Sequence, residues 1–374
     1  MDIKNRKIKI NVASFGGRSH LLDIARELAN QGYDVKFYSY TPTFYAKRFG
    51  LKKENNSFFW ILTIPFIIIS KITGLTAYLL YQYRTIYDYI LAIFMRQCNV
   101  FIGQAPMHIK SCQKAKQKGA LIIIESGLSH INEYNAYLKR NGISSKDIIG
   151  SDRFKKCYQE ADYITVASEF VKKGFIKNGI SEQKLFVNPY GVNITNFHPT
   201  ELTTNSYDAI VVGQWCKRKG VDLIIQASKD LGIKVLHVGN IVDMPFPEDK
   251  NFTHINSVPE NKLIDYYKQA KIFLFPSYED GFGLVLIQAL ICGLPIVCSK
   301  NTGGPTLRQM IEDKKWIIEM DNIDVESLKQ SITKALSLAK TQHGTRNYVT
   351  QHDLKQISWE AYGERYSKFI KEKR

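Results

Sequence analysis

The sequence predicts an α/β protein built from two doubly wound domains. Its 374 residues are too many for one hydrophobic core of ordinary size. Residues 8–12 form an apolar strand pattern, an amphipathic helix pattern follows over 21–30, and a second strand pattern covers 35–40. The same order starts again at 209–212. Two such openings predict two parallel sheets, each covered by helices on both faces.

The composition is that of an ordinary folded protein, with 44% apolar and 23% charged residues. No apolar signal core follows Met1, so we expect no secretory signal. The six cysteines show no Cys-x-x-Cys spacing, which favours reduced thiols in a cytoplasm and disfavours a zinc site. No Gly-x-Gly-x-x-Gly follows the first strand, so a nicotinamide cofactor is also disfavoured.

Positive charge is concentrated in the first part of the chain. The excess of Lys and Arg over Asp and Glu is 14 in residues 1–200 and 2 in residues 201–374. This imbalance predicts an anionic partner, either nucleic acid or a membrane surface. The sequence has no zinc-finger spacing and no aromatic RNA-binding signature, so we expect no nucleic acid.

Residues 55–83 form an apolar, aromatic-rich run in which Lys71 is the only charge. Pro65 and Lys71 divide the run into pieces shorter than the ~20 residues that a membrane-spanning helix needs. Lysines and arginines flank it, so we expect it to lie in the interface of an anionic membrane. Core helices and a true membrane span are the alternatives for this segment.

The most informative stretch is 276–297. It predicts a glycine-rich turn after a buried strand, then a helix, then a second apolar strand. Gly281 and Gly283 place backbone N–H groups at the start of the helix, where the helix dipole favours an anion. Asp280 stands just before the turn, and Gln288 lies about two helical turns further along nearly the same face.

This stretch resembles the donor-sugar site of family-4 retaining glycosyltransferases with the GT-B fold, also called group 1. Their pattern reads Pro-Ser-x-x-Glu-Gly-Phe-Gly-Leu-x-x-x-Glu-Ala-x-x-x-Gly-x-Pro-Val. The resemblance implies that the first acid, here Asp280, contacts the donor sugar and that the following N–H groups hold the diphosphate. It also implies that Gln288 occupies the position that grips the ribose. The donor-binding residues it implies in this stretch are Asp280, Gly281, Phe282, Gly283, Leu284, Val285 and Gln288.

The resemblance extends to the loop after the first strand of the second domain. Family members read Gly-Arg-x-x-x-x-Lys-Gly there, and the two cations neutralise the departing diphosphate. Gly213 matches the first glycine and Lys219 the lysine. Gln214 stands where the family has arginine, and Lys217 or Arg218 is the candidate for the missing charge.

The GT-B fold implied by the resemblance consists of two Rossmann-like domains that face a cleft. We expect an acceptor-side domain over 1–197, a nucleotide-sugar domain over 205–350, and a C-terminal helix over 351–374 that crosses back to the first domain. Gly16 and Gly17 match the glycine-rich loop by which the first domain approaches the donor.

Two further first-domain residues enter the predicted site. Many family members have a histidine or similar residue that contacts the donor sugar, and His130 is the candidate here. The predicted catalytic set is therefore Lys219, Asp280 and His130. His108 is a second histidine candidate, and Glu125 is predicted to bind the acceptor.

The function implied by the resemblance is retaining glycosyl transfer. The donor would be a nucleotide sugar, with UDP as the expected nucleotide, and the acceptor a saccharide or lipid-linked saccharide of cell-surface polysaccharide or lipopolysaccharide synthesis. The protein is expected to be cytoplasmic and peripheral on the inner face of the membrane. The sequence has no Asp-x-Asp motif, and neither a metal nor another cofactor is expected.

Two rival functions follow from the same residues. Gln214 and Gln288 replace a cation and a carboxylate, which would suit a GT-B protein that binds a sugar nucleotide or glycan without transferring it. A sugar-nucleotide epimerase of the same superfamily is the third interpretation, but it leaves the apolar run 55–83 unexplained.

Overall fold

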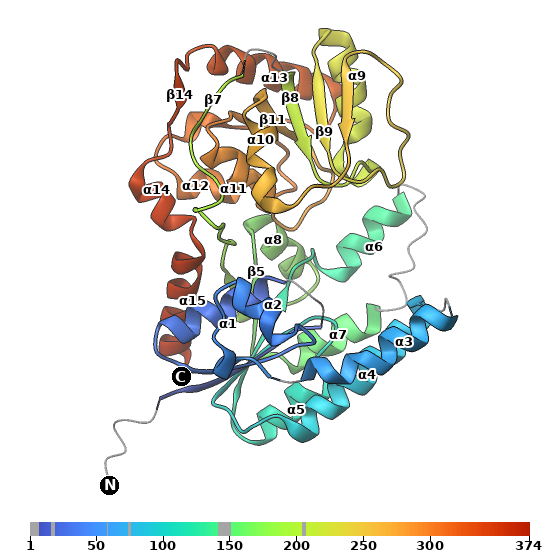
Figure 1. Cartoon of the computed structure of the whole chain (residues 1–374), viewed down its shortest axis with the longest axis vertical. Coiled ribbons are helices and arrows are strands. Elements are labelled where there is room, and N and C mark those ends of the chain that lie inside the picture. Colours follow the sequence, from blue (N-terminus) through green and yellow to red (C-terminus); the bar gives the residue numbers. More distant parts are fainter. Residues whose placement is uncertain (1–6, 16–18, 58, 74–75, 141–150, 204–206) are drawn as a thin grey trace. The chain divides into compact units, whose positions relative to one another are not determined.

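The protein forms two units, each with a six-stranded parallel sheet (Figure 1). The computed structural model describes residues 7–15, 19–57, 59–73, 76–140, 151–203 and 207–374. The first unit comprises Met1–Val166, Gly174–Asn188 and Tyr362–Arg374, and the second comprises Ala167–Lys173 and Pro189–Ala361.

The sheet of the first unit has the strand order β2-β1-β3-β4-β5-β6, with all neighbours parallel. Its strands are β1 (Lys9–Ala13), β2 (Asp34–Tyr38), β3 (Val100–Gln104), β4 (Leu121–Ser126), β5 (Tyr163–Val166) and β6 (Leu185–Val187). The central strands are apolar along nearly their whole length because helices cover both faces of the sheet. The order reverses between β1 and β3, the position where such sheets bind ligands.

The helices of the first unit include two apolar helices that are consecutive in the chain, α3 and α4. Its helices are α1 (His20–Asn30), α2 (Thr43–Arg48), α3 (Ile64–Thr73), α4 (Thr76–Phe94), α5 (Lys110–Gln117), α6 (Ile131–Arg140) and α7 (Ser151–Glu160), and the residues of α8 (Glu169–Lys177) are divided between the two units. A short 3-10 helix, η3 (Phe59–Thr63), leads into α3, and Pro65 lies in the first turn of α3, where proline is tolerated. Among the described helices, none is both long and apolar enough to cross a membrane.

The sheet of the second unit has the order β10-β9-β8-β11-β12-β13, again parallel throughout. Its strands are β8 (Tyr207–Val212), β9 (Val235–Val238), β10 (Phe252–Ile255), β11 (Ala270–Phe275), β12 (Ile296–Cys298) and β13 (Ile317–Glu319). This is the strand order of a dinucleotide-binding fold, with its reversal between β8 and β11. Buried aliphatic side chains of β8, β9, β11 and the helices α9 and α13 form its core.

The remaining elements of the second unit surround this sheet. They are α9 (Val221–Leu231), α10 (Ile264–Tyr267), α11 (Leu284–Ile291), α12 (Gly304–Met310), α13 (Val325–Ala339), α14 (Gln351–Gln356) and a two-stranded antiparallel ladder of β7 (Thr200–Glu201) and β14 (Thr345–Arg346). Figure 1 shows α9 and α13 next to the strands of this sheet, in agreement with the shared core.

The last helix, α15 (Trp359–Lys373), begins in the second unit and continues in the first. Tyr33, just before β2, shares a 2.8 Å hydrogen bond with Ser367. The ring of Phe186 on β6 stacks on that of Phe369, with 4.1 Å between their centroids. The predicted return of the C-terminal helix to the first domain is therefore confirmed.

Candidate functional site

The predicted donor loops follow two neighbouring strands of the second sheet. β8 and β11 pair in parallel, and the strand order reverses between them. Gly213 is the first residue after β8, and the stretch from Pro276 to Gly283 follows β11. Open α/β sheets bind their ligands beyond the carboxyl ends of strands at such a reversal. The sheet topology alone therefore marks these loops as a candidate site.

The two loops pack closely on each other. The short 3-10 helix η6 (Lys217–Lys219) follows β8, and the carbonyl of Arg218 accepts a 3.0 Å hydrogen bond from the backbone N–H of Tyr278. Gly220 has a φ of 72°, and any side chain there would collide with the carbonyl of Pro276. This contact fixes η6 against the loop after β11.

Two cations and two carboxylates converge between these loops. The ammonium group of Lys219 forms an ion pair with Oδ2 of Asp280. Nη1 of Arg218 lies 3.6 Å from the same oxygen, 3.3 Å from a carboxylate oxygen of Glu279 and 2.9 Å from the Glu279 carbonyl. All four side chains are largely shielded from solvent. The structure thus brings Arg218, and not only Lys219, to the predicted donor site.

Asp280 is held as a carboxylate by its neighbours. Burial acts to raise the pKa of Asp280, but Lys219 and Arg218 outweigh it and leave that pKa below its ordinary value. The backbone N–H of Phe282 donates a 3.1 Å hydrogen bond to the other carboxylate oxygen. Lys219 also lies over the ring of Phe275, 4.7 Å from its centroid.

The glycine-rich turn ends at the first residue of α11. Gly283, with a φ of 85°, precedes the helix, and an added Cβ would lie 2.6 Å from the ring of Phe275. The carbonyl of Gly281 accepts a 2.7 Å hydrogen bond from Ser168. The N–H groups of the first helical turn, which includes Leu284 and Val285, have no acceptor within the helix itself. They can therefore bind an anion.

Phe282 and Gln288 lie inward from this turn. The Phe282 side chain is buried and meets the ring of Tyr190 at a centroid distance of 5.6 Å. The Gln288 side chain is also buried, and its carbonyl oxygen accepts a 3.1 Å hydrogen bond from the hydroxyl of Tyr267. Phe282 thus contributes its backbone N–H to the site, while the side-chain amide of Gln288 is hydrogen-bonded to Tyr267 of α10.

The loop after β12 closes the far side of the turn. The carbonyl of Asn301 accepts a 3.0 Å hydrogen bond from the N–H of Asp280, and its amide donates to the carbonyl of Tyr278 at 2.9 Å. Gly303 packs so closely on Phe282 that a side chain there would overlap it. Three loops therefore hold Asp280 in place.

A pair of histidines supports the start of the β8 loop. Nε2 of His237 lies 2.9 Å from the carbonyl of Gly213, and its Nδ1 lies 2.9 Å from Nδ1 of His254. Since the carbonyl can only accept, His237 donates from Nε2 and its Nδ1 accepts from His254. Burial lowers the pKa of His237 to about 4, in keeping with this neutral form. Gln214, the next residue of the loop, is exposed.

The first-unit histidines that the sequence predicts are enclosed. His130 immediately precedes α6, and its ring contacts Tyr158 and Phe175 at centroid distances of 5.4 and 5.0 Å. Burial lowers the pKa of His130 to about 4, so the imidazole is neutral at pH 7. His108 is fully buried, and burial likewise lowers its pKa to about 4. Whether His130 meets the donor stays a prediction.

Glu125 lies at the end of β4 in a buried network. Its carboxylate accepts hydrogen bonds from Tyr366 at 2.6 Å and Tyr362 at 3.3 Å, and its other oxygen lies 3.1 Å from Nε2 of His20. Thr165 extends the network at 2.9 Å from the Tyr366 hydroxyl. These contacts link β4 to α15. The sequence predicted the return of the C-terminal helix but not these contacts, because the partners are more than 200 positions apart. Its predicted role in acceptor binding is not tested by this geometry.

Gly16 and Gly17 lie outside the described residues, so the structure leaves their predicted donor contact open. His20, which begins α1 soon after them, was not singled out from the sequence. Its ring contacts the buried carboxylate of Glu125.

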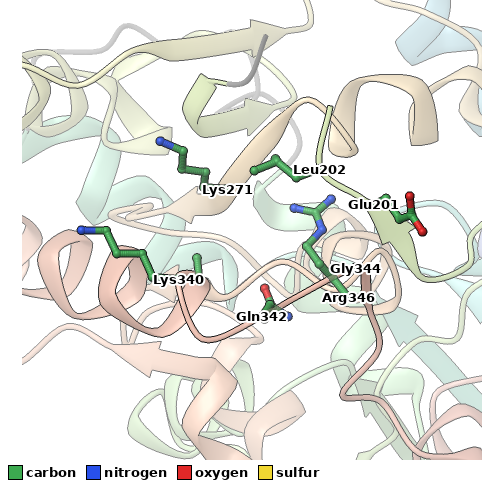
Figure 2. A pocket seen from close by; sticks show the side chains of 8 residues that line it. Glu201, Leu202, Lys271, Lys340, Gln342, Gly344 and Arg346 are labelled. Carbon is green, nitrogen blue, oxygen red and sulfur yellow. The ribbon is translucent and has the colours of Figure 1, made fainter. Parts of the chain in front are cut away.

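A hollow of about 320 Å³ lies at the opposite end of the second sheet. Figure 2 shows Lys271, Lys340 and Arg346 around it. Lys271 forms a 2.7 Å ion pair with Asp208, and the buried guanidinium of Arg346 donates to the backbone carbonyl of Thr200 and other nearby oxygens. None of the predicted site residues lines this hollow.

Within the part of the chain that the structure describes, no group of three or more His, Cys, Asp or Glu residues is arranged to hold a metal ion. The charged groups near Asp280 are instead paired with one another. This arrangement suits the binding of an anionic, hydroxyl-rich ligand through cations, backbone N–H groups and one carboxylate.

Comparison with known sequences agrees with this chemistry. Residues 248–352, which contain the turn before α11, match the family described as Glycosyl transferases group 1. The capsular polysaccharide biosynthesis glycosyltransferase CapM of Staphylococcus aureus is 25% identical over 240 residues. That alignment covers 56% of this chain and 62% of CapM, so the chain spans less than two thirds of this relative.

Solved structures are similar over nearly the whole chain. The sucrose-phosphate synthase of Thermosynechococcus elongatus gives a TM-score of 0.66 at 14% identity, covering 98% of this chain and 99% of that one. The Anabaena protein HepE in complex with UDP and glucose gives a TM-score of 0.59 at 12% identity, covering 98% and 100%.

The two doubly wound sheets, the returning C-terminal helix and these structural similarities define the GT-B fold. The predicted fold class is confirmed. Residues 248–352 match the group 1 glycosyltransferases, and the chain is similar to a glycosyltransferase of capsular polysaccharide synthesis.

Proposed function

We propose that the protein transfers a glycosyl group from a nucleotide sugar to a saccharide or lipid-linked saccharide, with retention of configuration. The observation that carries the proposal is the convergence of Lys219 and Arg218 on Asp280, at the strand-order reversal and just before α11. Cations and helix N–H groups suit a diphosphate, and a carboxylate beside them suits sugar hydroxyls. The two halves of a nucleotide sugar would thus be recognised side by side.

UDP is the nucleotide that we propose for the donor. The similar Anabaena protein was solved with UDP and glucose, which supports this choice. In the proposed complex, the first turn of α11 and the Gly281–Gly283 turn bind the diphosphate. Gln288 would contact the ribose through the part of its amide that Tyr267 does not engage.

The proposed acceptor belongs to a cell-surface polysaccharide or lipopolysaccharide. The support is the similarity to a capsular polysaccharide glycosyltransferase. Gly16 and Gly17 would approach the donor, as the sequence predicts, and acceptor binding by Glu125 stays a prediction. A lipid-linked acceptor would bring the protein to the inner, cytoplasmic face of a membrane.

The proposed mechanism needs no nucleophilic side chain. The acceptor oxygen attacks the anomeric carbon on the face from which the diphosphate leaves, and a phosphate oxygen takes the acceptor proton. The bond from the anomeric carbon to the diphosphate breaks as the new glycosidic bond forms. Lys219 and Arg218 would stabilise the charge that collects on the leaving diphosphate, while Asp280 and neutral His130 would orient the sugar. No metal is required in this scheme.

The apolar surface of η3, α3 and α4 supports membrane contact. The residues of this surface expose 38 to 78% of their area, and they are Ile61, Leu62, Ile64, Ile68, Ile69, Ile72, Ile86, Ile93 and Phe94. Exposed apolar side chains in such number mark an interaction surface. Lys47, Arg48 and Lys52 precede it and are exposed, which suits the headgroups of anionic lipids.

Vesicle sedimentation tests this surface. We expect the protein to bind vesicles that contain phosphatidylglycerol and to bind phosphatidylcholine vesicles weakly. Replacing Ile93 and Phe94 with serine should reduce binding, because both side chains lie 70% exposed on α4. Ile176→Ser, an exposed position on α8, is the control. Equal sedimentation of all variants, or none with anionic vesicles, would contradict membrane docking.

The activity itself is tested with a panel of nucleotide sugars. We expect one UDP-sugar to be hydrolysed slowly to sugar and UDP, and faster transfer when a membrane lipid extract supplies acceptor. Lys219→Ala and Asp280→Ala should lose both reactions. Failure of every nucleotide sugar to bind would refute the donor site.

A binding protein without turnover is the second candidate. It is favoured by the exposed Gln214, which leaves the family's arginine position without a cation, and by the anchoring of Gln288 to Tyr267. The two candidates differ in one measurement. Tight binding of a nucleotide sugar without hydrolysis or transfer, even with lipid extract, would favour the binding protein.

A further inference from the structure

The cation pair of the candidate donor site already has an anion bound to it. Oδ2 of Asp280 is in ion-pair contact with Lys219 and lies 3.6 Å from Nη1 of Arg218. No other side-chain carboxylate of the described residues pairs with Lys219, whereas Arg218 also meets Glu279. The Asp280 carboxylate thus occupies the point on which both cations converge.

We propose that the carboxylate of Asp280 is an internal substitute for the donor diphosphate and that the diphosphate displaces it from Arg218 and Lys219. This proposal rests on the proposed function and deepens it. It also assigns Arg218 as the second cation of the site, in place of the arginine that Gln214 lacks.

Electrostatics favour the exchange. The four charged groups balance to zero, since two cations face two carboxylates. A diphosphate carries more negative charge than one carboxylate and presents several acceptor oxygens, so it competes well for two neighbouring cations. Glu279 remains on Arg218 through both its carbonyl and its carboxylate, and it keeps the guanidinium aimed at the site.

The exchange gives Asp280 two successive roles. With no ligand, its carboxylate neutralises cations that would otherwise repel each other in a shielded position. Once the diphosphate has taken the cations, the carboxylate is released to accept hydrogen bonds from hydroxyls of the sugar. The backbone bond from Phe282 to the other carboxylate oxygen keeps it beside the turn. Diphosphate binding therefore prepares the sugar site.

The test measures binding of inorganic pyrophosphate, UDP and the preferred UDP-sugar by titration calorimetry. Pyrophosphate is included because its binding does not depend on the base or the sugar. Asp280→Asn removes the internal anion while keeping an oxygen for the Phe282 N–H, and we expect it to bind pyrophosphate and UDP roughly tenfold more tightly. The same variant should lose hydrolysis of the UDP-sugar.

The two cations are tested by Arg218→Ala and Lys219→Ala. Each should weaken pyrophosphate binding by roughly ten- to hundredfold, because each removes a charge-assisted hydrogen bond. Lys217→Ala is the matched control. It lies on the same short helix, but it forms no ion pair with the described acids, and we expect unchanged affinity.

Thermal unfolding supplies a second readout. Asp280→Asn should lower Tm without ligand, because it leaves two cations without their counter-ion, and pyrophosphate should raise its Tm more than that of the unaltered protein. Unchanged or weaker pyrophosphate binding by a folded Asp280→Asn variant would overturn the proposal. Arg218→Ala binding that matches Lys217→Ala would overturn the assignment of Arg218.

These results are separable from the proposed function. If the unaltered protein transfers sugar but Asp280→Asn does not bind pyrophosphate more tightly, the displacement proposal fails alone. If Asp280→Asn binds pyrophosphate more tightly and no nucleotide sugar is turned over, displacement holds and sugar transfer fails.

Discussion

Both units contain a six-stranded parallel sheet, but they differ in how far the charged side chains near the strand ends are enclosed. In the second unit, the charged site residues lie on the segments that follow β8 and β11, and their side chains are partly shielded from solvent. They are Arg218, Lys219 and Asp280. In the first, Glu125 lies at the end of β4, and its carboxylate is fully enclosed by two tyrosines and His20. A carboxylate at or beyond the carboxyl end of a parallel strand can thus lie near the surface or be enclosed by protein.

The difference lies in what the neighbouring element supplies. Next to β11, the turn leads into α11, and the first N–H groups of that helix have no acceptor within the helix. Next to β4, helix α15 supplies aromatic hydroxyl groups. Whether a strand-end carboxylate meets ligand or protein therefore depends on the element that packs over it, which local sequence does not reveal.

The largest expected effect is the loss of activity in Lys219→Ala. We expect kcat/KM for the preferred nucleotide sugar to fall by roughly 10²- to 10³-fold, because a cation that faces the leaving diphosphate is removed. Steady-state assays of sugar transfer or hydrolysis measure it. Lys217→Ala should keep its activity, and equal losses in both variants would show that loop disturbance, not charge, is responsible.

The next effect separates structure from function in the first unit. Glu125→Ala should lower the free energy of unfolding by about 3 kcal/mol, because a buried carboxylate with three partners is lost. Urea denaturation followed by circular dichroism measures it, and UDP affinity should not change.

The control for this variant is Glu133→Ala, whose partially exposed ion pair with Lys177 should contribute less than ~1 kcal/mol. A stable Glu125→Ala protein that has lost transfer would reverse the interpretation. It would make Glu125 an acceptor-binding residue, as the sequence predicts.

A smaller effect tests the close packing of the glycine turn. Gly283→Ala forces a side chain into a backbone with a φ of 85° and toward the ring of Phe275, so we expect a loss of roughly 2–3 kcal/mol of stability and weaker UDP binding. Gly232→Ala has a similar backbone, with a φ of 63°, but open space around it. It should cost about 1 kcal/mol and leave binding intact. Equal losses of stability and of UDP binding in the two variants would show that the close packing of Gly283 on Phe275 has no role.

The smallest effect concerns pH. His237 has a pKa of about 4 in the folded protein, below its ordinary value of 6.5. The unfolded chain therefore binds the proton first, and the stability from neutral His237 is lost as the pH falls from about 6.5 toward 4. The loss between pH 7 and pH 5 should be roughly 1–2 kcal/mol.

Comparison of urea unfolding at pH 7 and pH 5 checks this dependence. His237→Gln should reduce the difference between the two pH values, whereas His343→Gln, at an exposed position, should leave it unchanged. A pH dependence that is the same in all three proteins would contradict the buried neutral state of His237.

Much of the donor site could be predicted because its signals are local. The glycines of the turn, Asp280 and the strand before them all lie within a dozen residues, and local geometry fixes their relation. The choice between Lys217 and Arg218 could not be predicted. Three consecutive cations occupy one short 3-10 helix, and only the packing of that helix on the carbonyl of Pro276 decides which of them meets Asp280.

The first unit was predictable in architecture and less so in detail. The alternation of apolar strands and helices gives the parallel sheet. The enclosure of Glu125 depends on Tyr366, 241 positions further along the chain, and such a pairing leaves no local pattern. The apolar run 55–83 predicted a segment in the membrane interface. The exposed apolar surface continues along α4 to Phe94, because the helix does not end where the uncharged run ends.

The return of α15 has a consequence for the order in which the protein is made. The first unit includes residues from Tyr362 onward, so its packing is complete only when the ribosome has also produced the whole of the second unit. Until then, the carboxylate of Glu125 lacks its hydrogen bond from Tyr366, and the ring of Phe186 lacks its stacking contact with Phe369. The packing of the second unit, which ends at Ala361, can therefore be completed before that of the first unit, although most of the first unit is synthesised earlier.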